Sequence, residues 1–296
     1  MTGKVVFITG ASSGIGRSTA IYLNKSGYCV YAGARRVEKM ADLKEQGINI
    51  VELDVTKDGS MVAAVNKVAS ESGGIDILVN NAGYGSYGAL EDVPVDEARR
   101  QFEVNVFGMS RMIQLVLPDM RKKKYGKIIN ISSIGGKIYE PLGAWYHSAK
   151  YAVEGLSDCL RMELKDFGID VIVIEPGGIK TEWAGIAGDN LLKTSGNSAY
   201  GEMARRHAAF FSQANSDTGS GIMARYARKT MNPELIAGVI EKAIRSNNPK
   251  TRYIAGFLAK PSIFLRKLLS DKSYDRFNRM LIASMGRMAS ASLKNS

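Results

Sequence analysis

Residues 9–16 read Thr9-Gly10-Ala11-Ser12-Ser13-Gly14-Ile15-Gly16 and follow directly on the apolar run 5–8. The glycines allow the backbone to approach a ligand at points where a side chain would block it. If a helix begins in this turn, its unpaired N–H groups suit a pyrophosphate. A glycine-rich turn after a first strand therefore predicts an α/β fold that binds a dinucleotide, although a plain strand-to-helix turn uses the same residues.

The remainder of the chain alternates short apolar runs with helical segments, a pattern typical of a parallel sheet covered on both faces. The predicted strands cover residues 5–9, 28–33, 48–53, 75–80, 126–132, 170–175 and 252–255. The predicted helices begin near Gly14, Val37, Lys57, Val95, Trp145 and Pro233. Each connection is long enough for a right-handed crossover, so we expect a doubly wound parallel sheet of seven strands.

The composition is that of a globular protein with a large core, because 45% of the 296 residues are hydrophobic and 23% are charged. The net charge of +11 favours anionic partners. Two cysteines, Cys29 and Cys159, are too few for a disulfide framework, and we expect both in the packed core. With no leader-like segment and no apolar run that could span a membrane, we expect a cytoplasmic protein. His147 and His207 lie far apart, so no metal site is expected.

The end of the second predicted strand carries two basic residues where an NAD-binding fold would carry an acid. Arg35 and Arg36 follow Ala34, and guanidinium groups pair with a ribose 2′-phosphate through charge-assisted bonds. We therefore infer NADP(H), two solvated arginines being the alternative. Asp54 and Val55 follow the third strand, where they can contact the adenine, although a plain surface Asp fits equally well.

Tyr146 and Lys150 lie four residues apart in a predicted helix, so both side chains emerge on one face. Ser133 comes thirteen residues before Tyr146, at the end of a predicted strand. Asn105 lies inside the preceding long helix, where a buried Asn side chain requires hydrogen-bond partners. A lone Tyr-x-x-x-Lys is common by chance, so the inference of a shared site rests on Tyr146 and Lys150 together with Ser133 and Asn105.

Taken together, these pieces resemble the short-chain dehydrogenase/reductase family. The matching pieces, in family order, are residues 9–16, Asp54-Val55, Asn80-Asn81-Ala82-Gly83, Asn105, Ser133, Tyr146 with Lys150, and Pro176-Gly177-Gly178-Ile179-Lys180-Thr181. The resemblance covers residues 4 to about 256 and implies one Rossmann-type NADP-binding catalytic domain over residues 1–256. Residues 180–230 interrupt the alternation and are expected to form a substrate lid. Residues 257–296 are a basic amphipathic C-terminal extension.

The family implies a role for each of the four polar residues. Tyr146 would be the general acid in reduction and the base in oxidation, and its pKa must fall from its ordinary value for work near neutral pH. The ammonium of Lys150 would stabilise the phenolate and bind the nicotinamide ribose. Ser133 would donate to the substrate oxygen, and Asn105 would hold a water that relays protons to Lys150.

The family also implies which residues contact NADP(H). The expected contacts are Gly10, Ser12, Ser13, Gly14, Ile15, Gly16, Arg35, Arg36, Asp54, Val55, Asn81, Ala82, Gly83, Tyr146, Lys150, Pro176, Gly177, Ile179 and Thr181. Among them, the turn at Gly83 would leave room for the cofactor. The backbone of Ile179 and the hydroxyl of Thr181 would fix the carboxamide.

The expected reaction is hydride transfer between the cofactor and a small-molecule carbonyl or secondary alcohol. Tyr87, Tyr139, Trp145 and Trp183 bring aromatic side chains toward the cleft, which favours a bulky apolar substrate. The segment 80–91 is similar to family members that act on hydroxysteroids, retinoids and acyl-dihydroxyacetone phosphate. The alternative is an NADP(H)-binding sensor that catalyses nothing, but such chains usually lose the Tyr or the Lys.

The extension from residue 257 carries eight basic and two acidic residues among apolar ones. It can dock on its own domain, rest on an anionic membrane, cap the substrate cleft or pack on a partner subunit. The family commonly forms oligomers through the long helices from Val95 and Trp145, so a homo-oligomer is expected. Nucleic acid is not an expected partner, because the basic residues form no recognisable binding module.

Overall fold

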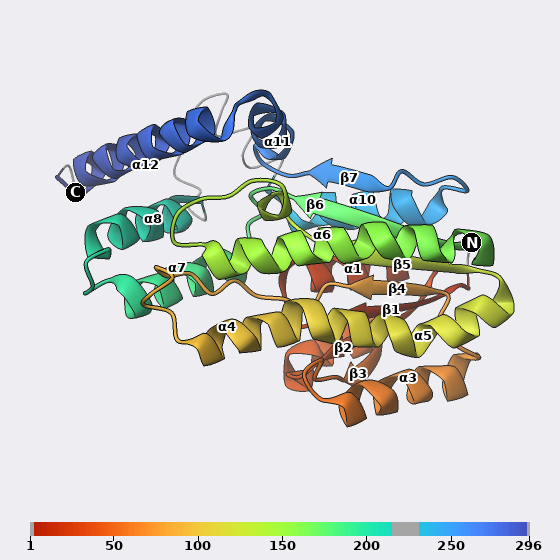
Figure 1. The fold of residues 1–296 in the computed structure, drawn as a ribbon. Helices are drawn as coiled ribbons and strands as arrows, with labels where there is room; N and C mark the ends of the chain where they lie inside the picture. The colour runs from red at the N-terminus through yellow and green to blue at the C-terminus, as the bar shows by residue number, and fades with distance from the viewer. Residues whose placement is uncertain (1–2, 215–230, 295–296) are drawn as a thin grey trace.

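The computed structural model describes residues 3–214 and 231–294, built around one sheet of seven parallel strands (Figure 1). The strands are β1 (Val5–Thr9), β2 (Cys29–Ala34), β3 (Asn49–Glu52), β4 (Ile77–Asn80), β5 (Gly126–Ile131), β6 (Ile169–Pro176) and β7 (Arg252–Ala255). Their spatial order is β3-β2-β1-β4-β5-β6-β7, so the chain reverses direction across the sheet between β1 and β4. Ligands of open α/β sheets bind beyond the carboxyl ends of the strands at such a switch point. The predicted doubly wound sheet is confirmed.

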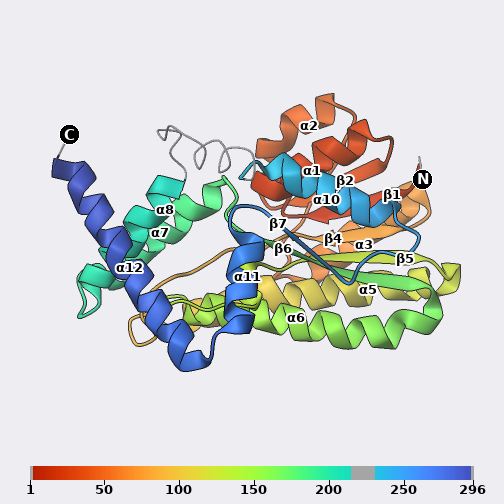
Figure 2. The ribbon, with the colours of Figure 1, turned by 90° about the horizontal axis from the view of Figure 1, so that it is seen from above.

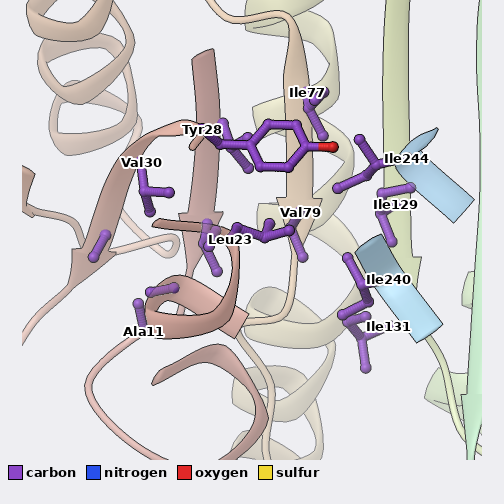
Figure 3. Packing of buried hydrophobic residues seen from close by; sticks show 14 of the residues in the cluster. Ala11, Leu23, Tyr28, Val30, Ile77, Val79, Ile129, Ile131, Ile240 and Ile244 are labelled. Carbon is purple, nitrogen blue, oxygen red and sulfur yellow. The ribbon is translucent and has the colours of Figure 1, made fainter. Parts of the chain in front are cut away.

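Helices cover both faces of the sheet (Figures 1 and 2). One face packs against α1 (Gly14–Lys25), α2 (Ala41–Glu45) and α10 (Pro233–Arg245), and the other against α3 (Asp58–Ser72), α5 (Met109–Lys123) and α6 (Ala144–Leu164). Along β1 the side chains alternate: Val6 and Ile8 enter the first layer, Val5 and Phe7 the second. Figure 3 shows the first layer, in which Leu23, Ile240 and Ile244 gather over the strands. Burial on both faces explains the near-continuous apolar runs.

The long helix after β4 is interrupted by a π-helical turn. It runs as α4 (Val95–Phe102), η2 (Glu103–Gly108) and α5, and Asn105 lies buried inside η2. Gly108 allows this turn to approach the loop after β3 closely, because a Cβ there would lie 2.4 Å from the carbonyl oxygen of Val55. Single π-turns are frequent at functional sites.

The segment expected as a lid contains two helices, α7 (Glu182–Ser195) and α8 (Gly201–Ala214). Its remainder, residues 215–230, lies outside the described residues. The C-terminal extension forms α11 (Ala259–Leu268) and α12 (Asp271–Lys294), and α12 contacts α8. Figure 1 shows α7 and α8 beyond the end of the sheet toward which the strand arrows point.

Other local features differ from the sequence expectations. The helix expected from Val37 begins as a 3-10 turn, η1 (Val37–Met40), and continues as α2. The cysteines were expected in the core, but Cys159 is exposed and Cys29 only half-buried. Cys159 lies on the side of α6 that turns away from the sheet, whereas Val153 packs into it. Within residues 3–214 and 231–294, no helix combines the length and apolarity needed to cross a bilayer.

Candidate active site

The glycine-rich turn after β1 is fastened to the turn after β4. The side-chain amide of Asn81 donates hydrogen bonds to the carbonyl oxygens of Thr9 (3.0 Å) and Gly10 (3.1 Å). A Cβ on Gly16 would lie 2.4 Å from that amide nitrogen, and one on Gly10, whose φ is +68°, would lie 2.7 Å from the Cα of Ala82. Asn81 and Ala82 were expected to contact the cofactor. In the structure they pack against the glycine-rich turn after β1 and fix its shape.

The first helix begins with its N–H groups open toward the switch point. α1 starts at Gly14, its N-cap Ser13 makes no side-chain capping bond, and no acidic residue lies in the first turn. A helix N-terminus of this kind favours an anion. Thr181, which follows β6, lies just above it, because a Cβ on Gly14 would be 3.2 Å from the Thr181 methyl group. The residues present fit a dinucleotide pyrophosphate. Ser12 belongs to the same turn, and Ile15 packs on the first core layer.

The two arginines after β2 are exposed and have different neighbours. The Arg36 guanidinium lies 3.9 Å from the carboxylate of Glu182 on α7. The positive charge of Arg35 acts on Asp54, whose Oδ1 accepts from the N–H (3.0 Å) and hydroxyl (2.8 Å) of Thr56. Burial raises the pKa of Asp54, but the Thr56 bonds and the Arg35 charge outweigh it and hold this pKa below its ordinary value. Val55 is buried in the second core layer.

Four polar side chains meet at the carboxyl ends of β4 and β5. Tyr146 and Lys150 lie one turn apart on α6, both buried. Ser133, whose Oγ accepts from the Gly135 N–H at 3.0 Å, lies near the Tyr146 ring, since a Cβ on Gly135 would be 3.0 Å from Tyr146 Cε1 and 3.4 Å from Ser133 Oγ. The Lys150 ammonium donates to the carbonyl oxygen of Ile131 at 2.9 Å. A Cβ on Gly83 would lie 3.0 Å from Asn105 Oδ1 and 3.8 Å from Lys150 Nζ. Glycine at position 83 thus leaves an open approach to both.

Asn105 fixes the loop that follows β4. Its Oδ1 accepts from the Tyr84 N–H at 3.0 Å, and its Nδ2 donates to the Tyr84 carbonyl at 2.8 Å. Both bonds depend on the π-turn, which directs this side chain toward the loop. These two hydrogen bonds satisfy the buried polar side chain of Asn105, as expected from the sequence.

Burial governs the protonation of the two central residues. It raises the pKa of Tyr146 to about 12, although the hydrogen bond from Ser133 lowers it, and the charge of Glu140 raises it further. Burial also lowers the pKa of Lys150 to about 8, against the charge of Glu154, which raises it. The family resemblance implied a lowered Tyr146 pKa. The structure gives a raised one because desolvation of the phenolate outweighs the hydrogen bond.

An aromatic shell surrounds Tyr146. Its ring lies 5.5 Å from that of Tyr87 and 5.3 Å from that of Trp183, and Phe211 of α8 packs on both of those neighbours. Tyr87 and Trp183 therefore lie beside Tyr146, where the sequence predicted the apolar lining of the cleft. Tyr139 instead contacts α12, and Trp145 packs on Phe102 of α4.

Two residues near Tyr146, His147 and Glu140, were not identified from the sequence as part of the site. His147 Nδ1 lies 2.9 Å from the carbonyl oxygen of Gly135, so this nitrogen carries the proton. Its Nε2 is buried, 3.9 Å from Glu140, whose carboxylate accepts from the Tyr87 hydroxyl at 3.2 Å. Adjacency to Tyr146 could have indicated His147, whereas nothing in the sequence marks Glu140.

The segment that follows β6, residues 177–181, faces the candidate site and is also fixed by contacts with β7 and the residues just after it. Gly177 donates from its N–H to the carbonyl oxygen of Ala255 at 2.8 Å, and a Cβ there would lie 2.4 Å from the carbonyl oxygen of Phe257. Pro176 ends β6, and Ile179 packs on the first core layer. The expected cofactor contacts of this segment therefore also serve packing.

Comparison with known proteins gives a consistent picture. The family model of the short chain dehydrogenases matches residues 4–190. The "Probable short-chain type dehydrogenase/reductase VdlC" of Helicobacter pylori is 33% identical over 282 residues, covering 95% of this chain and 99% of its own. The 3-ketodihydrosphingosine reductase of Bacteroides thetaiotaomicron is 41% identical over 181 residues, covering 61% and 66%.

Solved structures agree with the sequence matches. A short-chain dehydrogenase from Streptomyces avermitilis is 28% identical, with a TM-score of 0.72, and the match covers 97% of this chain and 98% of that one. A single-residue variant of the actinorhodin polyketide ketoreductase, solved with NADPH, is 26% identical, with a TM-score of 0.68 and coverage of 85% and 96%.

Proposed function

This chain belongs to the short-chain dehydrogenase family, and on that premise we propose that it is an NADP(H)-dependent oxidoreductase that interconverts a carbonyl group and a secondary alcohol. Its main support is the meeting of Ser133, Tyr146, Lys150 and Asn105 beside the open N-terminus of α1. When bound, the cofactor supplies or accepts the hydride. Retention of all four side chains argues against a non-catalytic NADP(H) sensor.

The protein residues handle the proton and the developing charge. Because its pKa is about 12, Tyr146 carries its proton at neutral pH and can give it to a carbonyl oxygen as the carbon is reduced. Ser133, which lies near the same hydroxyl, would donate to that oxygen. The Lys150 ammonium would hold the cofactor ribose and would favour the phenolate left behind, and Asn105 keeps the β4 loop in place.

The preference for NADP(H) rests on Arg35 and Arg36, because no acid stands at the end of β2 to hold an unmodified ribose. The polyketide ketoreductase of the same fold was solved with NADPH, which is consistent with this preference.

A bulky apolar substrate, such as a steroid, retinoid or lipid-like ketone, suits the surroundings of Tyr146. The aromatic shell of Tyr87, Trp183 and Phe211 offers apolar area but few polar partners. One relative is a 3-ketodihydrosphingosine reductase, which by its name acts on a long-chain ketone. On this proposal, α7 and α8 are the substrate lid of a catalytic domain formed by residues 1–256.

The test is consumption of NADPH and of NADH by the purified chain against ketosteroids, retinal, acyl-dihydroxyacetone phosphate and small ketones. We expect turnover of one apolar class with NADPH. Tight NADPH binding with no turnover on any of them would remove support for the reaction, and faster turnover with NADH would contradict the cofactor preference.

A homo-oligomer is proposed through the long helices α4, α5 and α6. Large apolar side chains are exposed along them, including Phe107, Tyr151 and Met162. Exposed apolar side chains on neighbouring helices are typical of subunit interfaces. Light scattering on the purified chain should give a multiple of 32.2 kDa, and a monomeric mass would contradict this proposal.

A further inference from the structure

The C-terminal helices α11 and α12 are anchored to the domain by their inner sides. Ile263 and Tyr274 are buried against it. The Tyr139 hydroxyl donates to Asp275 at 3.0 Å, and Asn278 donates to the Tyr139 carbonyl oxygen at 2.8 Å. The two helices are therefore held in one orientation, which leaves a defined side of each facing outward.

The outer sides carry large apolar residues. Phe264 and Leu268, one turn apart on α11, are 67% and 69% exposed, and Met280 of α12 is 58% exposed. Figure 1 shows α11 and α12 at the top of the molecule, and in Figure 2, seen from above, no other described helix is drawn across them. Apolar side chains gathered on one outer segment mark a contact surface more often than scattered single ones do.

Cations accompany these apolar residues at helical spacing. On α11, Lys260 precedes Phe264 by four residues, and on α12, Lys272, Arg276 and Met280 follow one another at intervals of four. These cations are exposed. Two acids lie nearby: Asp271 pairs with Arg266, and Asp275 accepts from the Tyr139 hydroxyl and keeps its charge. Together the two helices therefore combine exposed apolar side chains with an excess of positive charge.

We propose that the outer faces of α11 and α12 rest on an anionic lipid surface, with Phe264, Leu268 and Met280 entering the boundary of the acyl chains and the cations contacting the headgroups. Basic amphipathic helices of this composition bind in the plane of such surfaces. A second copy of the chain is a poorer occupant. A twofold interface would bring two copies of the same positively charged surface together.

The experiment is co-sedimentation of the full chain with vesicles of phosphatidylcholine alone or of equal parts phosphatidylcholine and phosphatidylglycerol. We expect binding to the anionic vesicles that is reversed by high salt. The double substitution Phe264→Ser and Leu268→Ser should abolish it. The matched control replaces Leu90 and Phe167, which are 61% and 43% exposed on other parts of the molecule, with Ser and should bind as the wild type does.

A second pair of variants isolates the charges. Lys260, Lys267 and Lys272 changed to Gln should weaken binding by about fivefold for each charge removed. The exposed Lys44, Lys122 and Lys165 changed to Gln should leave it unaltered. Two results would overturn the proposal: equal binding to neutral and anionic vesicles, or no binding to the anionic vesicles. If, in the second case, the Phe264→Ser, Leu268→Ser variant also loses mass in light scattering, the face is a contact between copies.

Discussion

Tyr146 is buried among aromatic rings, and the nearby Ser133 side chain lowers its pKa against the larger effect of burial. Replacing it with Phe removes the transferable proton while keeping the ring that packs on Tyr87 and Trp183. We expect turnover to fall by at least about a hundredfold, with NADPH binding measured by fluorescence unchanged.

Tyr151 on the same helix is the matched control, because its ring is exposed. Changing Tyr151 to Phe should leave the rate as it was. Normal turnover by the Tyr146→Phe variant would show that another group provides the proton.

Lys150 has a buried negative charge behind it. Glu154, one turn further along α6, accepts from Lys137 (2.9 Å) and Arg252 (3.0 Å), and its charge raises the pKa of Lys150. Removing that charge in Glu154→Gln should lower the Lys150 pKa further below its value of about 8. The alkaline limb of the pH–rate profile should then move to lower pH.

Asp158 supplies the control for this variant. It also pairs with Arg252, at 2.7 Å, but lies two turns beyond Lys150 and is not among the groups that shift the pKa of Lys150. Asp158→Asn should leave the alkaline limb in place. Identical pH profiles for the two variants would show that Glu154 does not act on Lys150.

The turn after β2 and the start of α7 meet at Arg36 and Glu182, and on the proposed function this contact lies where the cofactor is selected. Replacing Arg35 and Arg36 with Gln should weaken NADPH binding by about ten- to a hundredfold, because charge-assisted bonds to the 2′-phosphate are lost, and NADH binding far less. Equilibrium titrations with both cofactors measure this difference. An equal loss for NADPH and NADH would contradict the assignment of these arginines.

A substitution at Glu182 of α7 gives a second test of the role of Arg36. Its carboxylate lies 3.9 Å from Arg36, so it competes with a 2′-phosphate for that guanidinium. Since both groups are exposed, Glu182→Gln should tighten NADPH binding by no more than about fivefold. NADH binding should not change. Weaker NADPH binding by this variant would mean that Glu182 itself supports the cofactor.

The β1–α1 turn should tolerate no side chain at Gly16. A Cβ there would meet the Asn81 amide at 2.4 Å and the Gly10 carbonyl oxygen at 2.5 Å, and Gly16→Ala should cost about 1–3 kcal/mol of unfolding free energy. Gly155, inside α6, has nothing within 4 Å of its Cβ position. Gly155→Ala should stabilise by about 0.5–1 kcal/mol. Urea unfolding checks both, and equal effects would contradict the close packing of the turn.

At the scale of the whole molecule, apolar periodicity was enough to predict the sheet. β1 and β7 have the predicted bounds, and the other strands differ at their ends by one or two residues. Local patterns carry this information because burial on both faces demands apolar runs. The sequence also predicted, through spacing and family resemblance, the four polar residues that the structure brings together, and their roles remain a proposal.

Features set by contacts between distant segments were not predictable. The π-turn at Asn105 depends on the close approach of Gly108 to Val55, and the surroundings of Tyr146 depend on Glu140 and α8. The raised Tyr146 pKa follows from that enclosure, which no single motif reports. The same holds for the anchoring of α12 through Tyr139.

On the proposed function, the chain transfers a hydride between NADP(H) and an apolar carbonyl compound, with Tyr146 as the proton donor. The most direct measurement uses NADPH deuterated at the transferred position with the ketone panel, followed by mass spectrometry of the products. Deuterium on the carbinol carbon of an apolar product, absent when Tyr146 is changed to Phe, is the predicted result. Tight cofactor binding without deuterium in any product, or equal labelling by the variant, would contradict the account.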